Sequence, residues 1–111
     1  MVEISVSGLD NATLVEVQGR IDSMNANQFG EGLAAPIEDG QVNIVLDLSG
    51  VEYMSSAGLR EIVGSLKKAK RNGGDIRIAQ PSDRVREVLE LAGLDTIVQI
   101  FNTQLEAVGS F

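Results

Sequence analysis

The sequence predicts an α/β domain in which one mixed β-sheet, an N-terminal hairpin followed by parallel strands, is covered by about four helices. Two observations support this fold class. The first two strand-like segments are joined by a short turn, which is typical of antiparallel strands. Every later strand-like segment is separated from the next by a segment with the apolar spacing of a helix, which is typical of parallel strands.

The hairpin is expected within residues 2–7 and 13–17, where apolar and polar side chains alternate. The Gly-Leu-Asp-Asn segment between them, residues 8–11, favours a turn. A helix follows, for which Asp22 or Ser23 can supply the cap. We expect its buried side to contain Ala26, Phe29 and Leu33.

This first helix is predicted to be weak. Gly30 and Gly32 lower its intrinsic helix propensity, and Pro36 is expected to prevent a regular interior near its end. The next stretch, residues 42–71, is better specified and organises the rest of the chain. It contains a buried strand over residues 42–48, then a turn with two adjacent hydroxyl groups, then an amphipathic helix.

Both ends of this central helix are specified by the sequence. Its start is predicted at or next to Ser56, since a serine can cap the first free amides of a helix. Basic residues gather in its last turn, and Asn72-Gly73-Gly74 supplies a left-handed stop. Its buried stripe follows the i, i+3, i+4, i+7 spacing, at Leu59, Ile62, Val63 and Leu66.

Four further elements are expected after the stop, beginning with a short strand over residues 76–79. A helix then starts at Pro81-Ser82-Asp83 and ends at Gly93, with a buried stripe of Val85, Val88, Leu89 and Ala92. The last strand is expected over residues 97–101. Thr103 to Glu106 matches a capping box, and the short final helix should bury Leu105 and Val108.

Composition excludes several classes of function. With 111 residues, the chain is expected to form one domain, residues 1–111, that is stable without a disulfide or metal. Cysteine and histidine are absent, which removes the usual nucleophile, general base and metal ligands. We therefore expect no enzyme activity, no cofactor and no metal. The net charge of −7 argues against nucleic acid or an anionic membrane as a partner and favours a basic protein.

No secretory signal or apolar run long enough for a membrane span is present in the sequence, so a cytoplasmic protein is expected. The remaining candidate site is the hydroxyl pair Ser55-Ser56 at the strand-to-helix turn. On one interpretation both serines only cap the helix. On the other, one serine is exposed at the end of the strand, where the active site of another protein can approach it. The pattern alone does not decide between these interpretations.

Two groups of residues in this region carry a family resemblance. Leu46-Asp47-Leu48-Ser49-Gly50-Val51, followed by Tyr53-Met54-Ser55-Ser56-Ala57-Gly58-Leu59, resembles the signature of STAS domains of the anti-sigma factor antagonist family. Val17-Gln18-Gly19-Arg20-Ile21-Asp22 resembles the early segment of that family, and the stretch from Ala92 to Phe101 resembles its closing segment. The resemblance is to stand-alone members and implies the STAS fold.

The resemblance also implies a function. In this family a partner kinase phosphorylates the serine two residues before the motif glycine, which by position is Ser56, with Ser55 as the second choice. The unmodified form would bind an anti-sigma factor that is also a serine kinase of the GHKL type, and a serine phosphatase would reset the phosphorylated form. ATP and magnesium would belong to the kinase. The partner-binding residues implied are Asp22, Ser23, Met54, Ser55, Ser56, Ala57, Gly58 and Arg60.

The structural interpretation of Asp22 is an ordinary helix cap, whereas the family resemblance places its carboxylate beside Ser56. One departure from the family lies at Ser55, where many members have aspartate. An alternative function is a scaffold or accessory subunit that does not switch, in a stress-sensing or lipid-transport assembly. An enzyme or small-ligand binder is the least supported, because the aspartates Asp22 and Asp47 have no companion ligands at a recognisable spacing.

Overall fold

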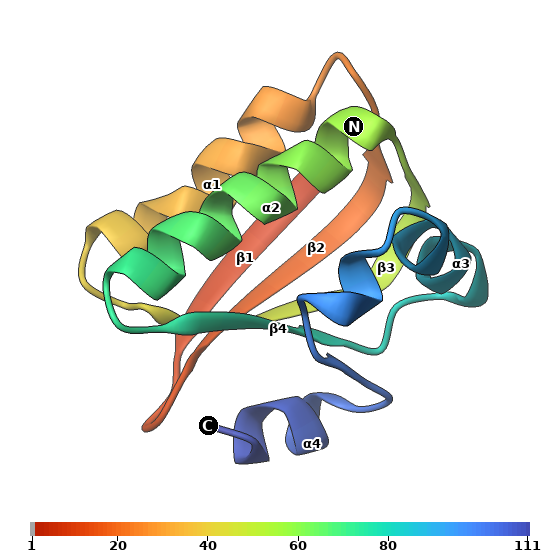
Figure 1. Cartoon of the computed structure of the whole chain (residues 1–111). Coiled ribbons are helices and arrows are strands. Elements are labelled where there is room, and N and C mark those ends of the chain that lie inside the picture. The colour runs from red at the N-terminus through yellow and green to blue at the C-terminus, as the bar shows by residue number, and fades with distance from the viewer. Residues whose placement is uncertain (1) are drawn as a thin grey trace.

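The computed structural model describes residues 2–111, which form one five-stranded sheet with the strand order β1-β2-β3-β4-β5 (Figure 1). The strands are β1 (Val2–Gly8), β2 (Thr13–Ile21), β3 (Asn43–Met54), β4 (Asp75–Ala79) and β5 (Ile100–Phe101). β1 is antiparallel to β2, and all later neighbouring pairs are parallel. The predicted mixed sheet is confirmed. Met1, which the predicted domain includes, lies outside the described residues.

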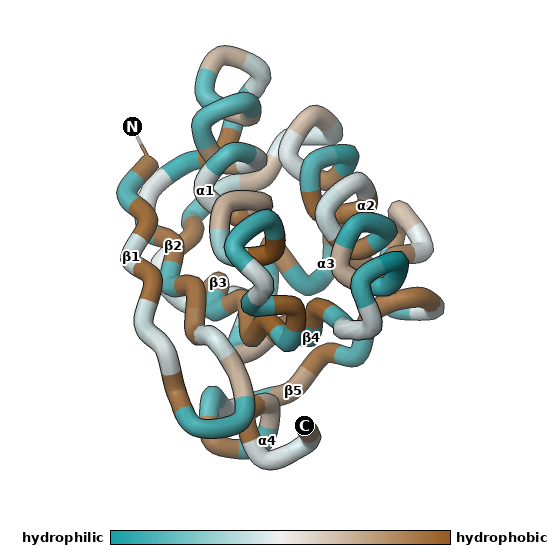
Figure 2. Tube along the Cα trace, turned by 90° about the vertical axis from the view of Figure 1, so that its left-hand side faces the viewer, coloured by the Kyte–Doolittle hydropathy of each residue, from teal (hydrophilic) through white to brown (hydrophobic). Residues whose placement is uncertain are grey.

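Helices cover the two faces of the sheet unequally. The helices are α1 (Ala26–Glu38), α2 (Ser56–Arg71), α3 (Asp83–Leu91) and α4 (Gln104–Gly109), and a 3₁₀ turn, η1, spans Leu94–Thr96. In Figure 1, α1, α2 and α3 lie on one face, and α4 lies on the opposite face. Figure 2 shows hydrophilic and hydrophobic positions alternating along these helices, as expected for helices with one buried side.

The main core lies between the sheet and α1, α2 and α3. Phe29 and Leu33 of α1, Ile62 of α2 and Leu89 of α3 are fully buried there, as the apolar spacing predicted for each. A smaller apolar cluster lies on the other face, which we call the α4 face. It contains the side chains of Ala12, Leu14, Val45, Ala79 and Ala107. The larger part of the hydrophobic stabilisation therefore comes from the three-helix side.

The first helix is more regular than predicted. α1 continues through Pro36 to Glu38, so the expectation that Pro36 prevents a regular interior is wrong. Proline removes one helical hydrogen bond and crowds the carbonyl four residues earlier, but Pro36 lies only two residues before the last residue of α1, so most of the helix precedes it. A Cβ atom at Gly32 would lie 2.6 Å from Ile4 Cδ1, so this glycine lets α1 approach β1 closely.

The central strand is longer than predicted, because it ends at Met54 and not at residue 48. Its register with β2 runs from Thr13 opposite Ile44 to Ile21 opposite Met54, with irregularities between Glu16 and Arg20. β4 pairs with β3 only as far as Asp47. The last seven residues before Ser55 therefore form an extension of β3 beyond β4, supported by β2 (Figure 1).

The end of α2 agrees with the prediction. Gly73 has a φ of +87°, and its N–H donates to Lys70 O, while the N–H of Gly74 donates to Ala69 O at 2.8 Å. This is the Schellman pattern. A Cβ atom at Gly74 would lie 2.0 Å from Val42 O, so the chain approaches β3 too closely for any side chain there.

The C-terminal third contains three corrections. The last strand is limited to Ile100–Phe101, because the chain from Leu94 first forms η1, and Ile97 is 48% exposed. In α3, Ala92 lies past the helix end and is exposed. In α4, Leu105 is 83% exposed and Ala107 is fully buried, so the predicted burial of Leu105 is wrong. The predicted cap is confirmed, since Thr103 Oγ1 accepts from the N–H of Glu106 at 3.1 Å.

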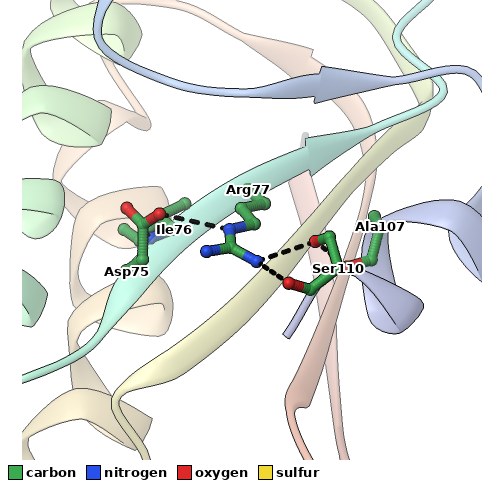
Figure 3. Close-up of polar contacts among 5 residues, drawn as sticks. All are labelled: Asp75, Ile76, Arg77, Ala107 and Ser110. Atoms are coloured by element: carbon green, nitrogen blue, oxygen red, sulfur yellow. Dashed lines mark hydrogen bonds and ion pairs between the residues drawn. The ribbon is translucent and has the colours of Figure 1, made fainter.

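Polar contacts fix the segment after α4 to the sheet (Figure 3). Arg77, in the middle of β4, donates from Nη1 to the backbone oxygen of Ser110 and, at 2.9 Å, to its hydroxyl. The same guanidinium bonds Asp75 at 3.2 Å through Nε and lies 4.0 Å from the centre of the Phe111 ring. A six-residue helix is too short to be stable alone, so these contacts and the burial of Ala107 hold it in place.

Candidate functional site

The candidate site lies where β2 and β3 end together. Ile21 is paired with Met54, and the N–H of Ser55 donates to Ile21 O at 2.8 Å. The segments that follow the two strands, residues 22–25 after β2 and Ser55 with the first turn of α2 after β3, therefore leave the sheet side by side. We call this region, residues 21–25 together with residues 54–60, the β2–β3 end.

Ser55 is the cap of α2. Its backbone is extended, with a φ of −83° and a ψ of 168°, and its Oγ accepts from the N–H of Gly58 at 3.3 Å. Its backbone oxygen accepts from the N–H of Leu59 at 3.1 Å. Ser55 thus has the structural role that the capping interpretation gives to this pair of serines.

Ser56 differs from Ser55 in each of these respects. It is the first residue of α2, its side chain is exposed, and among residues 2–111 its hydroxyl makes no hydrogen bond. The two interpretations of the hydroxyl pair therefore divide between the two serines. Ser55 has a bonded oxygen that orders the helix start, and Ser56 presents a hydroxyl group to solvent.

The start of α2 is also electropositive. The first turn contains no acidic residue, and within residues 2–111 the N–H groups of Ser56 and Ala57 have no hydrogen-bond acceptor. Free amides at a helix N-terminus, together with the helix dipole, favour negative charge nearby. A phosphoryl group on Ser56 would be compatible with the folded helix for this reason.

Asp22 orders the connection that follows β2. Its Oδ1 accepts from the N–H groups of Met24 at 3.0 Å and Asn25 at 3.1 Å. In return, its own N–H donates to Asn25 Oδ1 at 2.9 Å. α1 begins only at Ala26, after Asn25, so Asp22 caps the preceding turn and not the helix itself, and Ser23 is an exposed member of that turn. Asp22 and Ser56 lie on neighbouring connections.

Not all of the predicted partner-binding residues are accessible. Ser23, Ser56 and Arg60 are exposed, whereas Met54 is 2% exposed. Gly58 is also buried, and a Cβ atom there would lie 2.7 Å from Ile21 Cγ2 and 3.0 Å from Met54 Cγ. Met54 and Gly58 therefore pack beneath the turn and position its exposed residues. The partner-binding role of the whole set stays a prediction.

One exposed residue at this end was not predicted. Met24 is 92% exposed, in the turn ordered by Asp22. It belongs to no strand or helix pattern, and this is the one signal in the sequence that could have drawn attention to it. Single exposed apolar side chains are common on protein surfaces, so Met24 is a candidate binding residue because of its position beside Ser23 and the start of α2.

The described residues contain no group of three or more acidic, histidine or cysteine side chains that could hold a metal ion. An open hollow of about 490 Å³ lies between α2, α3 and η1, bordered by Lys70, Arg86 and Glu90, but it is far along α2 from Ser56. Within residues 2–111, none of the helices is both long and apolar enough to span a membrane.

Comparison with known proteins gives a consistent result. The family model described as "STAS domain" matches residues 3–107. BtrV of Bordetella bronchiseptica, provisionally named an anti-sigma factor antagonist, is 31% identical over 110 residues, which cover 99% of this chain and 95% of BtrV. The anti-sigma-B factor antagonist of Bacillus subtilis is 30% identical over 99 residues, which cover 89% of this chain and 90% of that protein.

Among solved structures, the protein tm1081 of Thermotoga maritima, also provisionally named an anti-sigma factor antagonist, superposes with a TM-score of 0.90. It is 30% identical, and the match covers 96% of this chain and 92% of that one. The names of all three proteins describe regulators and not enzymes, in agreement with the expectation that this chain is not an enzyme.

Proposed function

Because this chain belongs to the STAS domain family, we propose that it is an anti-sigma factor antagonist that is switched by phosphorylation of Ser56. The unmodified protein binds an anti-sigma factor that is also a serine kinase, and the sigma factor is released. Phosphorylation ends this binding, and a separate phosphatase restores it. The exposed, unbonded hydroxyl of Ser56 at the first position of α2 is the observation that carries this proposal.

The covalent step requires little from this chain. The γ-phosphoryl group of ATP is transferred to Ser56 Oγ, ADP leaves, and a base of the kinase takes the hydroxyl proton. ATP and magnesium are bound by the kinase, since this chain offers neither a phosphate-binding glycine loop nor a metal-ligand cluster among residues 2–111. This chain contributes an accessible nucleophile in a fixed position.

Electrostatics and desolvation explain how the modification would end binding. Phosphorylation adds about 1.5 to 2 negative charges and three acceptor oxygens at neutral pH. In a complex these must be desolvated against a surface that had fitted a neutral hydroxyl, and this costs binding free energy. Because the free amides of α2 tolerate an anion, the fold itself is not disrupted. The switch therefore needs no large conformational change.

The assignment to Ser56 over Ser55 has a physical reason. A phosphoryl group on Ser55 would turn the hydroxyl oxygen that accepts from the N–H of Gly58 into a bridging ester oxygen, which is a weaker acceptor. It would also have to fit at a half-buried position, whereas Ser56 is exposed. Modification of Ser55 would thus disturb the start of α2, which modification of Ser56 leaves intact.

Site-mapped intact mass tests the assignment. The protein is incubated with ATP, magnesium and the candidate kinase, as wild type, Ser56→Ala and Ser55→Ala. We expect one phosphate on wild type and Ser55→Ala, and none on Ser56→Ala. Modification that persists in Ser56→Ala and disappears in Ser55→Ala would assign the acceptor to Ser55. An unmodified wild type that still binds the partner would instead indicate a scaffold that does not switch.

A further inference from the structure

Arg60 lies one helical turn after Ser56 on the same exposed face of α2. Residues four apart on a helix have Cβ atoms about 5–6 Å from each other. Helical side chains also lean toward the N-terminus of their helix, so the guanidinium group of Arg60 can reach the turn that contains Ser56. Both residues are exposed, so no packed neighbour blocks an approach between them.

Arg60 is free to take a new partner. The ion pairs among residues 2–111 join Lys68 to Glu38 at 3.3 Å and Arg77 to Asp75 at 3.2 Å, and neither involves Arg60. Glu61, its neighbour in sequence, faces α1, where its carboxylate fills the space above Gly30. The Arg60 side chain is therefore an uncompensated positive charge near an uncompensated helix N-terminus.

The other charged side chains around the start of α2 lie on other elements of the fold. Asp22 uses its carboxylate in the turn before α1, and Glu52 and Asp83 add negative charge on β3 and at the start of α3. Arg20 lies on β2, with its guanidinium 4.7 Å from the centre of the Tyr53 ring. Among the described residues that surround the start of α2, Arg60 is thus the cation placed on the same helix face as Ser56.

We propose that Arg60 is the intramolecular counter-ion of phosphorylated Ser56, an inference that rests on the proposed function. An acidic group followed by a basic group four residues later is the favourable order on a helix, and the phosphoryl group at the first position of α2 also suits the helix dipole. No covalent bond changes in this step. The guanidinium group exchanges water for the phosphoryl oxygens, with which it can form paired hydrogen bonds.

This pair gives the modification a second effect. In the unmodified protein, Arg60 presents a positive charge next to the Ser56 hydroxyl. After phosphorylation, the same side chain is held by the phosphoryl group and is withdrawn from the partner. Phosphorylation would then both add negative charge to the surface and remove a donor from it.

The test installs phosphoserine at position 56 during translation, so that no kinase is needed. The full chain is prepared with serine or phosphoserine in wild type, Arg60→Gln and Lys67→Gln. Lys67 is a matched control, because it is an exposed cation on the same helix that lies about 16 Å from Ser56 along the helix axis. Unfolding midpoints are measured at low and high salt, and the phosphoryl group is titrated by ³¹P NMR.

The expected result is a difference between variants. Phosphorylation should be more stabilising by about 2–5 °C in wild type and Lys67→Gln than in Arg60→Gln. High salt should reduce this difference. The ³¹P titration midpoint should lie at lower pH in wild type than in Arg60→Gln, since the cation favours the dianion. An equal effect of phosphorylation on all three proteins, with equal titration midpoints, would overturn the pairing.

The outcome is independent of the proposed function. If no kinase modifies Ser56, the proposed function fails. The phosphoserine installed during translation still shows whether Arg60 pairs with the phosphoryl group. If the pair does not form but a kinase modifies Ser56 and binding is lost, the proposed function stands and added charge alone accounts for the switch.

Discussion

The β2–β3 end and the α4 face belong to the same sheet, but they differ in hydrogen bonding. The buried carboxylate on the α4 face is fully hydrogen-bonded, whereas polar groups at the β2–β3 end are not. On the α4 face, Asp47 is 3% exposed and both of its carboxylate oxygens are bonded. Oδ1 accepts from the N–H of Ser49 at 2.8 Å, and Oδ2 accepts from Gln80 at 3.1 Å and from Gln104. At the β2–β3 end, the Ser56 hydroxyl and two helix amides have no partner among residues 2–111.

This difference in hydrogen bonding distinguishes groups with a structural role from groups with a candidate functional role. A buried carboxylate whose oxygens are all bonded stabilises one arrangement and has no free capacity for chemistry. Exposed groups without partners contribute little to stability and remain available to another protein. Asp47 was among the aspartates with no recognisable companions in the sequence, and its companions are two glutamine amides that come from distant parts of the chain.

The largest effect on stability is expected at the buried acid. Asp47→Ala removes the acceptor of the Gln80 amide and leaves the Gln104 amide with Glu16 alone, in a part-buried site, so the free energy of unfolding should fall by about 2–4 kcal/mol. Denaturant unfolding measures this loss. Phosphorylation of the folded fraction should continue, and a variant that keeps wild-type stability would contradict the structural role.

A smaller loss is expected from Arg77→Met, which keeps the aliphatic packing but removes the polar contacts shown in Figure 3 and the contact of the guanidinium group with the Phe111 ring. We expect a decrease of about 1–2 kcal/mol, since charge-assisted bonds and ring stacking are lost together. Hydrogen exchange should become faster in α4 and remain unchanged at the β2–β3 end. Faster exchange in both regions would show that the stability of the β2–β3 end depends on the docking of α4.

The cap at the β2–β3 end should matter less. Ser55→Ala removes the acceptor for the N–H of Gly58, and the expected decrease is about 0.5–2 kcal/mol. Ser56→Ala is the matched control, because its hydroxyl bonds nothing among residues 2–111 and its loss should leave the unfolding midpoint nearly unchanged. Equal losses for the two variants would remove the distinction between the serines.

The smallest stability effects are expected at exposed apolar side chains. Met24→Ser and Leu105→Ser should each change the free energy of unfolding by less than about 0.5 kcal/mol, as is usual for surface positions. Their effects on partner binding should differ. Met24 lies at the β2–β3 end, so Met24→Ser should weaken binding to the partner, whereas Leu105→Ser on α4 should not. Calorimetric titration distinguishes the two, and equal affinities for both variants would place Met24 outside the binding surface.

The sequence predicted most of the elements that rest on local patterns. The hairpin, the helix after Ser55, the left-handed stop at Gly73 and the cap at Thr103 depend on neighbouring residues and were confirmed. The errors concern tertiary effects. The extension of β3 to Met54 depends on pairing with β2, and the burial of Ala107 in place of Leu105 depends on the direction in which α4 docks.

The candidate site was predicted in part for the same reason. The position of the hydroxyl pair at a strand-to-helix turn follows from local spacing, but the division of roles between Ser55 and Ser56 depends on side-chain exposure. The bonds of Asp22 to its own turn, and the burial of Met54 and Gly58, likewise require the folded chain.

The central claim is that phosphorylation of the unbonded Ser56 hydroxyl controls partner binding. The most direct measurement is the affinity of the anti-sigma factor for three forms of the chain: unmodified wild type, wild type with phosphoserine at position 56, and Ser56→Ala. We predict that phosphoserine lowers the affinity at least about tenfold, a change of about 1.4 kcal/mol, and that Ser56→Ala binds like unmodified wild type. Equal affinities for the unmodified and phosphorylated forms would contradict the switch.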